Sequence, residues 1–343
     1  MTYQPPFEIT PTIVNQISAI AGLVERLDGS PLTTSPQLHK QNRIRTIQGT
    51  LAIEGNSLTL DQITVILNGQ RVLGPLREIS EVQGAIRAYE SLPTWVPSSR
   101  QDLLQAHRLL MADILTDPGK LRTGGVGIYK GTQVSHVAPP AKLVPQLIDD
   151  LLDWLDTTDH HPLITSSVFH YELEFIHPFV DGNGRMGRLW QTLILGQWHD
   201  LFYLLPIESL IKDQQDRYYQ VLEEADQAAD STCFIEFMLD IIRTALSQGS
   251  ELSRSASGDS LIDSTGDQVS DQVSDQVRQL LTLMDDRYWS TQELMAGLSL
   301  THKPTFRKNY LNPALKAGLV VMQYPDSPRS PKQKYKKAST WPR

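Results

Sequence analysis

The chain has 343 residues, 40% hydrophobic and 20% charged, as in an ordinary globular protein of one or two domains. Its single cysteine, Cys233, excludes an intramolecular disulfide framework and a cysteine-based zinc site. The first residues lack a secretory leader pattern, and no apolar run reaches the ~20 residues that cross a bilayer. A cytoplasmic protein without membrane contact is therefore expected.

The formal net charge of −8 is unevenly distributed. Ten Lys and Arg residues but only one acidic residue, Asp326, lie between Lys303 and Arg343. The tail therefore carries about +9 and the rest of the chain about −17, which predicts an acidic body joined to a basic module. The basic module could bind DNA, an acidic protein, or the chain's own body.

Apolar residues at helical spacing predict a mainly α-helical body, with Gly29, Gly55 and the pair Asn68-Gly69 as helix stops. The helices expected in chain order are residues 13–27, 38–54, 61–67, 80–91, 100–115, 141–155, 166–176, 185–198, 212–227 and 232–246. One segment breaks this order. Residues 124–140, GGVGIYKGTQVSHVAPP, alternate small, β-branched and aromatic residues and predict a β-hairpin.

The C-terminal part begins with a Ser-, Gly- and Asp-rich stretch, residues 248–270, which predicts a linker. The repeat DQVSDQVSDQV over residues 267–277 places valines every four residues, as in the extended first helix of a following domain. Short helices are expected over residues 277–284, 290–298 and 304–317. An extended segment follows them, and this order is typical of a winged helix-turn-helix domain.

The segment HPFVDGNGRMGR, which begins at His177, contains the residues best suited to chemistry. Pro178 prevents the preceding apolar helix from continuing. Gly182 and Gly184 permit positive φ and a close approach of a ligand to the backbone. The helix that starts near Arg185 offers free N–H groups, so this turn predicts an anion site.

Charged side chains complete the segment. Arg185 and Arg188 are three residues apart on a helix and can each hold phosphate oxygens in bidentate fashion. Asp181 is a hard oxygen ligand suited to Mg²⁺ that arrives with phosphates. His177 can accept a proton near neutral pH. A base, a metal ligand and two phosphate-binding arginines beside one anion loop indicate nucleotide transfer.

The segment resembles the signature of the Fic family, His-Pro-Phe-x-Asp/Glu-Gly-Asn-Gly-Arg-x-x-Arg, at every fixed position. The hairpin and the sequence YYQVLEEAD, which begins at Tyr218, are similar to the flap and a later helix of that family. The basic tail is similar to the winged-helix tail of many bacterial members. The resemblance covers about residues 40–340 and implies a Fic-type helical bundle with a β-hairpin flap.

The resemblance implies an adenylyltransferase that moves AMP from Mg-ATP to a Ser, Thr or Tyr hydroxyl of a target protein, which could be the chain itself. His177 would take the hydroxyl proton, and Asp181 would hold Mg²⁺ between the α- and β-phosphates. Asn183, together with the amides around Gly182 and Gly184, would hold phosphate oxygens. The remaining implied roles are β- and γ-phosphate binding by Arg185 and Arg188, and anchoring of the loop by Phe179.

Other residues receive roles from the same resemblance. The flap residues Gly127, Ile128, Tyr129 and Lys130 would bind the target backbone by adding a strand. Tyr218 and Tyr219 are candidates for adenine contact, although aromatic residues of a helical core fit the pattern equally well.

The segment TLAIEGN, which begins at Thr50, resembles the family's inhibitory motif in the version that precedes the core. Glu54 would pair with Arg188 and keep the γ-phosphate from its productive place. One guanidinium cannot serve a carboxylate and a triphosphate in the same way.

The expected domains are an N-terminal helical region (1–95, inhibitory helix about 41–55), a catalytic core (96–247), a linker (248–270) and a winged-helix-like domain (271–343). The N-terminal helices are candidates for a homodimer interface. Two alternatives remain. One is a DNA-binding regulator whose Fic body senses nucleotide. The presence of His177 argues against it, because a nucleotide sensor needs phosphate-binding residues but no catalytic base. The other is removal of AMP, or transfer of another phosphate-linked group.

Overall fold

The computed structural model describes residues 3–125, 127–130, 133–257, 277, 280–281, 283–284, 287–298, 306–316, 319–324 and 333–338. The chain divides into two compact units, Met1–Gly258 and Asp259–Arg343. Each unit has its own cluster of buried hydrophobic residues. Within the described residues, no helix has both the length and the hydropathy needed to span a membrane.

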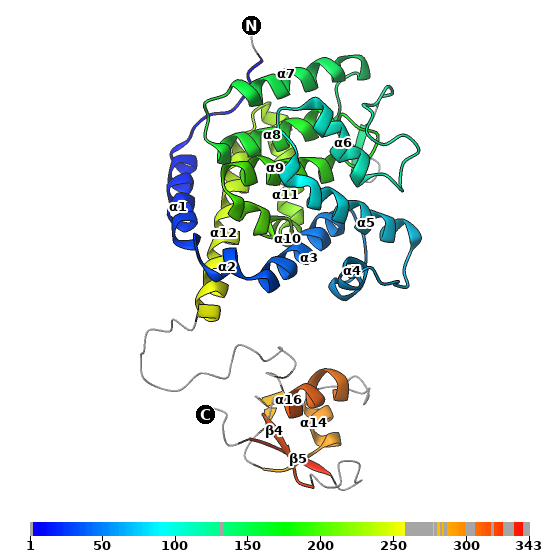
Figure 1. Cartoon of the computed structure of the whole chain (residues 1–343), viewed down its shortest axis with the longest axis vertical. Coiled ribbons are helices and arrows are strands. Elements are labelled where there is room, and N and C mark those ends of the chain that lie inside the picture. The colour runs from blue at the N-terminus through cyan, green and yellow to red at the C-terminus, as the bar shows by residue number, and fades with distance from the viewer. Residues whose placement is uncertain are drawn as a thin grey trace. The chain divides into compact units, whose positions relative to one another are not determined.

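The first unit is helical, as the apolar spacing predicts, and α8 and α9 lie at its centre (Figure 1). Its elements are α1 (Pro11–Leu27), α2 (Pro31–Thr34), α3 (Pro36–Ile53), α4 (Leu60–Leu67), α5 (Leu76–Ser91), η1 (Leu92–Thr94), α6 (Arg100–Leu110), β1 (Gly127–Lys130), β2 (Gln133–Val137), η2 (Ala141–Leu143), α7 (Val144–Thr157), α8 (Pro162–Ile176), α9 (Asn183–Trp198), η3 (Asp200–Leu204), α10 (Ile207–Asp213), α11 (Gln215–Ala228) and α12 (Thr232–Ser257).

Local sequence sets where the early helices begin and end. The Ser35 side chain caps α3 by accepting from Leu38 N, and Pro36 occupies the first turn, where its missing N–H costs nothing. The helix ends at Ile53, with Glu54 as its C-cap, because Gly55 adopts φ 88°. Gly69, at φ 72°, follows the end of α4 in the same way. The predicted stops at Gly55 and Asn68-Gly69 are thus confirmed.

Several predicted helix boundaries are wrong; the helix predicted over residues 100–115, for example, ends as α6 at Leu110. The helix predicted to end at residue 246 continues as α12 to Ser257, so residues 248–257 are not linker. Gly249 is buried there, and a Cβ on it would lie 2.8 Å from the Leu32 side chain, so packing against α2 accompanies the extra turns. The helix predicted from residue 212 is two helices, α10 and α11, because Gln214 leaves helical geometry at φ −115° and ψ 31°.

The hairpin predicted over residues 124–140 is present as antiparallel strands β1 and β2. Gly127 pairs with Val137, and the register shifts between Ile128 and Tyr129. The backbone thus forms a two-stranded flap in the segment that precedes α7.

The second unit combines short helices with a small antiparallel sheet in the order β3-β5-β4. Its elements are β3 (Trp289–Ser290), α14 (Thr291–Gly297), η4 (Arg307–Leu311), α16 (Asn312–Lys316), β4 (Val320–Met322) and β5 (Lys334–Lys337). Ser290 and Glu293 form a capping box at the start of α14. Arg307 and Lys334 are exposed, whereas Lys303, Arg329 and Lys332, with most of the valine repeat, lie outside the described residues.

Candidate active site

His177 occupies the turn between α8 and α9. It is the C-cap of α8 and adopts φ 50° and ψ 60°, a left-handed conformation that is uncommon for a residue with a Cβ. Its N–H donates to Leu173 O (2.9 Å), and its Nδ1 lies 3.3 Å from Glu174 O. When Nδ1 carries the proton and donates to this carbonyl, the ring's basic lone pair is on Nε2.

Phe179 anchors the loop that follows. Its ring is fully buried and stacks on the His107 ring, with 3.8 Å between the ring centroids. Asn183 Oδ1 accepts from Phe179 N (2.8 Å), and Asn183 Nδ2 donates to Phe179 O (2.9 Å). The side chain of Asn183 therefore closes the loop, and only its backbone fits the predicted contact with phosphate. The anchoring position predicted for Phe179 agrees with its burial.

The two loop positions Gly182 and Gly184 require glycine for different steric reasons. Gly182 caps α9 at φ 89° and lies against Met111, whose Sδ would be 2.8 Å from a Cβ. A Cβ on Gly184 would lie 2.7 Å from Glu54 Oε1 and 3.1 Å from Glu174 Oε1. Without a Cβ at residue 184, the Glu54 and Glu174 side chains lie close to the first turn of α9, where an anion could take their place.

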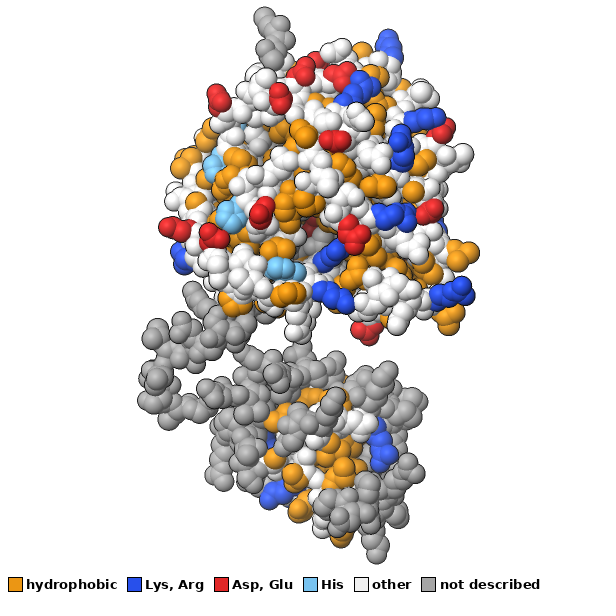
Figure 2. All heavy atoms as spheres, viewed as in Figure 1, with side chains coloured by type: hydrophobic (Ala, Val, Ile, Leu, Met, Phe, Trp, Pro, Cys, Tyr) orange, Lys and Arg blue, Asp and Glu red, His pale blue; other side chains and the backbone are white. Residues whose placement is uncertain are grey.

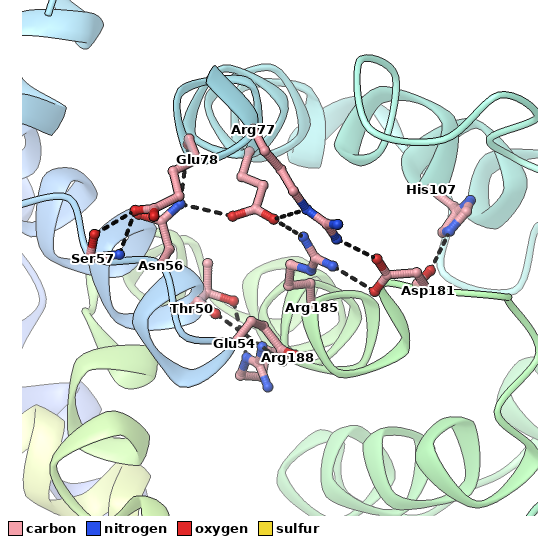
Figure 3. Close-up of polar contacts among 11 residues, drawn as sticks. Thr50, Glu54, Asn56, Ser57, Arg77, Glu78, His107, Asp181, Arg185 and Arg188 are labelled. Atoms are coloured by element: carbon pink, nitrogen blue, oxygen red, sulfur yellow. Dashed lines mark hydrogen bonds and ion pairs between the residues drawn. The ribbon is translucent and has the colours of Figure 1, made fainter. Parts of the chain in front are cut away.

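Arg185 and Asp181 form one side of a polar network (Figure 3). Arg185 Nη2 donates to Asp181 Oδ1 (2.9 Å), and Arg77 Nη2 from α5 donates to Asp181 Oδ2 (3.2 Å). Glu81 lies 3.7 Å from Arg185 Nη1, and Arg185 Nε is buried without a hydrogen-bond partner among the described residues. The Asp181 side chain is 35% exposed, so a ligand can still reach this carboxylate.

Arg188 forms the other side, together with the end of α3. Its Nη2 donates to Glu54 Oε1 (2.7 Å) and Thr50 O (3.1 Å), and its Nε donates to Thr50 Oγ1 (3.0 Å). Burial acts to lower the pKa of Arg188, but the Glu54 carboxylate and other acidic neighbours raise it overall. The Arg188–Glu54 pairing expected from the inhibitory motif is thus present. In this structure, Arg188 and Arg185 bind different carboxylates rather than one common partner.

The two tyrosines of α11 differ in position. Tyr218 is fully buried, with its hydroxyl 3.0 Å from His170 Nε2 and 3.3 Å from Glu174 Oε1. The adenine contact predicted for Tyr218 does not fit this burial, because the aromatic ring belongs to the helical core. Tyr219 is 41% exposed and donates to Ile53 O (3.4 Å), so its predicted role stays a prediction.

Arg122 is a site residue that sequence reasoning missed. Its buried guanidinium donates to His177 O (2.7 Å), Ile176 O (3.2 Å), Gly124 O (3.0 Å) and Pro139 O (2.6 Å). These carbonyls come from the end of α8 and from both flanks of the flap, where the helix dipole also favours a cation. No local pattern marks Arg122, because most of its partners are distant in sequence.

A second missed feature links the inhibitory segment to Asp181 (Figure 3). Asn56 Nδ2 donates to Glu81 Oε2 (2.9 Å), and Glu81 Oε1 lies near both Arg77 Nε (3.4 Å) and Arg185. Because both arginines also contact Asp181, the residues after Glu54 and the predicted metal ligand share one network. Within the described part of the chain, no cluster of three or more His, Cys, Asp or Glu forms a ready metal site.

Two family models match this chain. Residues 97–195 match the Fic/DOC family, and residues 275–337 match the C-terminal domain of Filamentation induced by cAMP protein Fic-like. The crystal structure of a Fic family protein from Desulfovibrio desulfuricans G20 is 48% identical, covers 99% of this chain and 100% of that one, and superposes with a TM-score of 0.70.

Curated relatives also match. Protein adenylyltransferase fic-1 of Caenorhabditis briggsae is 31% identical over 224 residues, covering 61% of this chain and 42% of the relative. The protein of the same name from Caenorhabditis elegans is 34% identical over 191 residues, covering 52% and 35%. The chain thus spans about two fifths of the length of these relatives. The nearly complete match to the Desulfovibrio structure at 48% identity shows that the chain belongs to the Fic family.

Proposed function

We propose that this protein is an adenylyltransferase that moves AMP from ATP to a hydroxyl side chain of a target protein. The observation that carries the proposal is the α8–α9 turn, where His177, the Gly182–Gly184 loop and Arg188 lie on one short, internally anchored segment. The names of the curated relatives support the same activity.

In the proposed reaction, His177 accepts the proton of a Ser, Thr or Tyr hydroxyl, and the oxygen attacks the α-phosphorus of ATP. The bond from that phosphorus to the bridging oxygen breaks, and pyrophosphate leaves. Such transfer depends mainly on position and on charge stabilisation. The amides at the start of α9, with Arg185 and Arg188, would hold the departing phosphates. Arg122 would keep His177 in place through its backbone carbonyl.

Asp181 would hold the magnesium that accompanies ATP. Its carboxylate is partly exposed and adjoins the anion loop, and a single carboxylate suits Mg²⁺ because this ion keeps phosphate and water ligands. When bound, the ion would neutralise negative charge on the phosphates. Since Arg77 and Arg185 both contact Asp181, ATP would draw Arg185 from the carboxylate toward phosphate.

Glu54 would act as a brake within the same site. Its carboxylate binds Arg188 and lies over Gly184, so it occupies the place that a phosphate needs. ATP can still bind in a different pose, but productive binding requires Glu54 to leave Arg188. The flap would bind the target by pairing with an extended segment, which uses only the backbone of β1.

The C-terminal unit would recruit a partner through its basic residues. Arg307 and Lys334 are exposed in it, which fits an acidic protein surface or DNA. DNA binding by the full chain that weakens steeply with salt supports DNA, and no salt-dependent DNA binding supports an acidic protein.

The reaction class is tested with ATP labelled on either the α- or the γ-phosphate, using wild type and Glu54→Gly. Covalent label from the α-position alone, on protein that has been denatured and washed, is the expected result. Label from the γ-position would instead indicate phosphate transfer, and no label from either position in Glu54→Gly would contradict the proposal.

A further inference from the structure

A cavity lies outside the proposed nucleotide site, beside the half of α3 that precedes Thr50. Its volume is about 600 Å³, within the range of small-molecule sites. It is lined by α3, the end of α4, the end of α5 with η1, and η3. In Figure 2, Lys, Arg and His side chains, with acidic side chains among them, lie around a hollow over the region where Figure 1 places α3. None of the residues of the proposed nucleotide site lines this cavity.

One wall of the cavity is cationic, because His39, Lys40 and Arg43 of α3 line it. Lys40 Nζ donates to the neutral amide oxygen of Asn68 (2.7 Å), a contact that leaves its charge uncompensated. Arg43 Nη2 forms an ion pair with Glu90, which also lines the cavity, and Arg43 Nε is buried without a hydrogen-bond partner among the described residues. Unsatisfied buried donors are costly, so this wall favours an anion.

The facing walls are mostly apolar. Tyr89 and Tyr203 line the cavity together with leucine and proline residues of α4, η1 and η3, and Asn68 and Glu90 are the polar residues beside them. A flat apolar body would remove these surfaces from water while its anionic group met the cationic wall. The combination of few charged groups with apolar surroundings is typical of sites for small organic ligands.

The cavity is joined to the Arg188 site by two routes. Tyr89 donates to Glu208 Oε1 (2.9 Å), and the same oxygen accepts from Thr192 of α9 (3.0 Å). The second route is α3 itself, since Thr46 lines the cavity and Thr50, one turn later, binds Arg188. Between these two threonines α3 lies directly against α10, where a Cβ on Gly49 would be 2.6 Å from the backbone N of Ser209.

We propose that this cavity binds a small organic anion, with one carboxylate or phosphate on a flat apolar body, and that the bound anion strengthens the pairing of Glu54 with Arg188. The cavity is present in the structure in which that pair is formed. A ligand that bridges α3 to its neighbours therefore favours this arrangement. Only the consequence for AMP transfer rests on the proposed function.

Binding is tested on the full chain by titration with phenyl phosphate and with benzoate, followed by calorimetry. Lys40→Gln and Arg43→Gln are compared with Lys120→Gln, which removes an exposed lysine of another ion pair. Saturable binding that weakens about tenfold or more in the first two variants, but not in Lys120→Gln, is expected. No saturable binding of either probe overturns the site. Binding that survives in Lys40→Gln but is lost in Arg185→Gln also overturns the site, because the probe then binds at the Gly182–Gly184 loop rather than in the cavity.

The coupling is tested by hydrogen exchange, which does not depend on AMP transfer. Saturating phenyl phosphate should slow exchange of the amides of residues 50–56 by about fivefold or more in wild type, and leave Lys40→Gln unchanged. Unchanged exchange in wild type with the probe bound would disprove the coupling. Because this readout needs no nucleotide, its failure is distinct from a failure of the proposed activity.

Discussion

Arg188 is the residue for which the Glu54 carboxylate and an incoming phosphate would compete. Its guanidinium is buried and is already satisfied by Glu54 and by two oxygens of Thr50. A phosphate that approaches the start of α9 must therefore replace the carboxylate, since both need the same donors. We therefore propose that the competition for this one side chain controls the reaction.

Removal of the competing carboxylate should raise activity. We expect Glu54→Gly to increase AMP transfer, including self-modification, by at least about tenfold, because each 1.4 kcal/mol of released competition is tenfold in rate. Transfer of α-label measures this. The matched control is Glu78→Gly, since Glu78 binds Ser57 near the same loop but does not contact Arg188. Equal rates in Glu54→Gly and wild type would rule out the brake.

Glu174 should make stability depend on pH. Burial, with the nearby Glu54 carboxylate, raises its pKa from 4.5 to about 7, against the opposing effects of Arg188 and the Tyr218 hydroxyl. The folded protein then binds more protons than the unfolded chain between these values, so stability falls as pH rises from about 4.5 to 7. Relative to Glu174→Gln, the free energy of unfolding of wild type should fall by on the order of 2 kcal/mol across this pH window. Denaturant unfolding at several pH values measures it, and parallel curves for the two proteins would contradict it.

At the scale of elements, the end of α8, the flap and the anion loop act as one assembly. Arg122 connects the carbonyls at the end of α8 to both flanks of the hairpin, and its own N–H donates to Pro178 O (2.8 Å). Arg122 therefore connects both flanks of the flap to the turn that carries His177. We therefore propose that target binding at the flap is linked to the position of His177.

Loss of this connection should affect both stability and activity. We expect Arg122→Met to lower the free energy of unfolding by about 3 kcal/mol, because several buried carbonyls lose a charged donor. AMP transfer should fall at least about tenfold even below the melting transition. Arg100→Met, which removes a partly exposed arginine paired with Asp149, is the control and should change little. Activity equal to wild type in folded Arg122→Met would refute the linkage.

Some elements could be predicted from sequence because their signals are local. The hairpin, the end of α3 at Gly55 and the start of α9 after the glycine turn follow from turn residues and helix spacing. The role of Arg122 could not be predicted, since its partners lie up to 55 residues away. The same is true of the burial of Tyr218, which depends on packing against other helices, and of the continuation of α12 beyond residue 246.

At the scale of the whole molecule, the two units have separate cores. The first holds every residue of the proposed reaction and of the cavity, and the second holds a smaller cluster that includes Phe306 and Tyr335. Independent cores predict independent unfolding. The C-terminal unit should therefore influence where the protein binds rather than whether the site forms.

Deletion of the second unit tests this independence. A chain of residues 1–258 should melt within about 3 °C of the main transition of the full chain, because its core is complete. It should also keep the AMP transfer of Glu54→Gly within about twofold, since no site residue is removed. Calorimetry and α-label transfer measure the two effects. A loss of the main transition would show that the first unit depends on the second.

The central claim is that His177 is the base for AMP transfer at the α8–α9 turn. The most direct measurement compares transfer of α-label by Glu54→Gly with transfer by the double variant Glu54→Gly, His177→Ala, with ATP binding measured in both. We predict that the double variant binds ATP within about threefold of Glu54→Gly and loses at least about 100-fold in transfer. Full transfer by a double variant that still binds ATP would contradict the account.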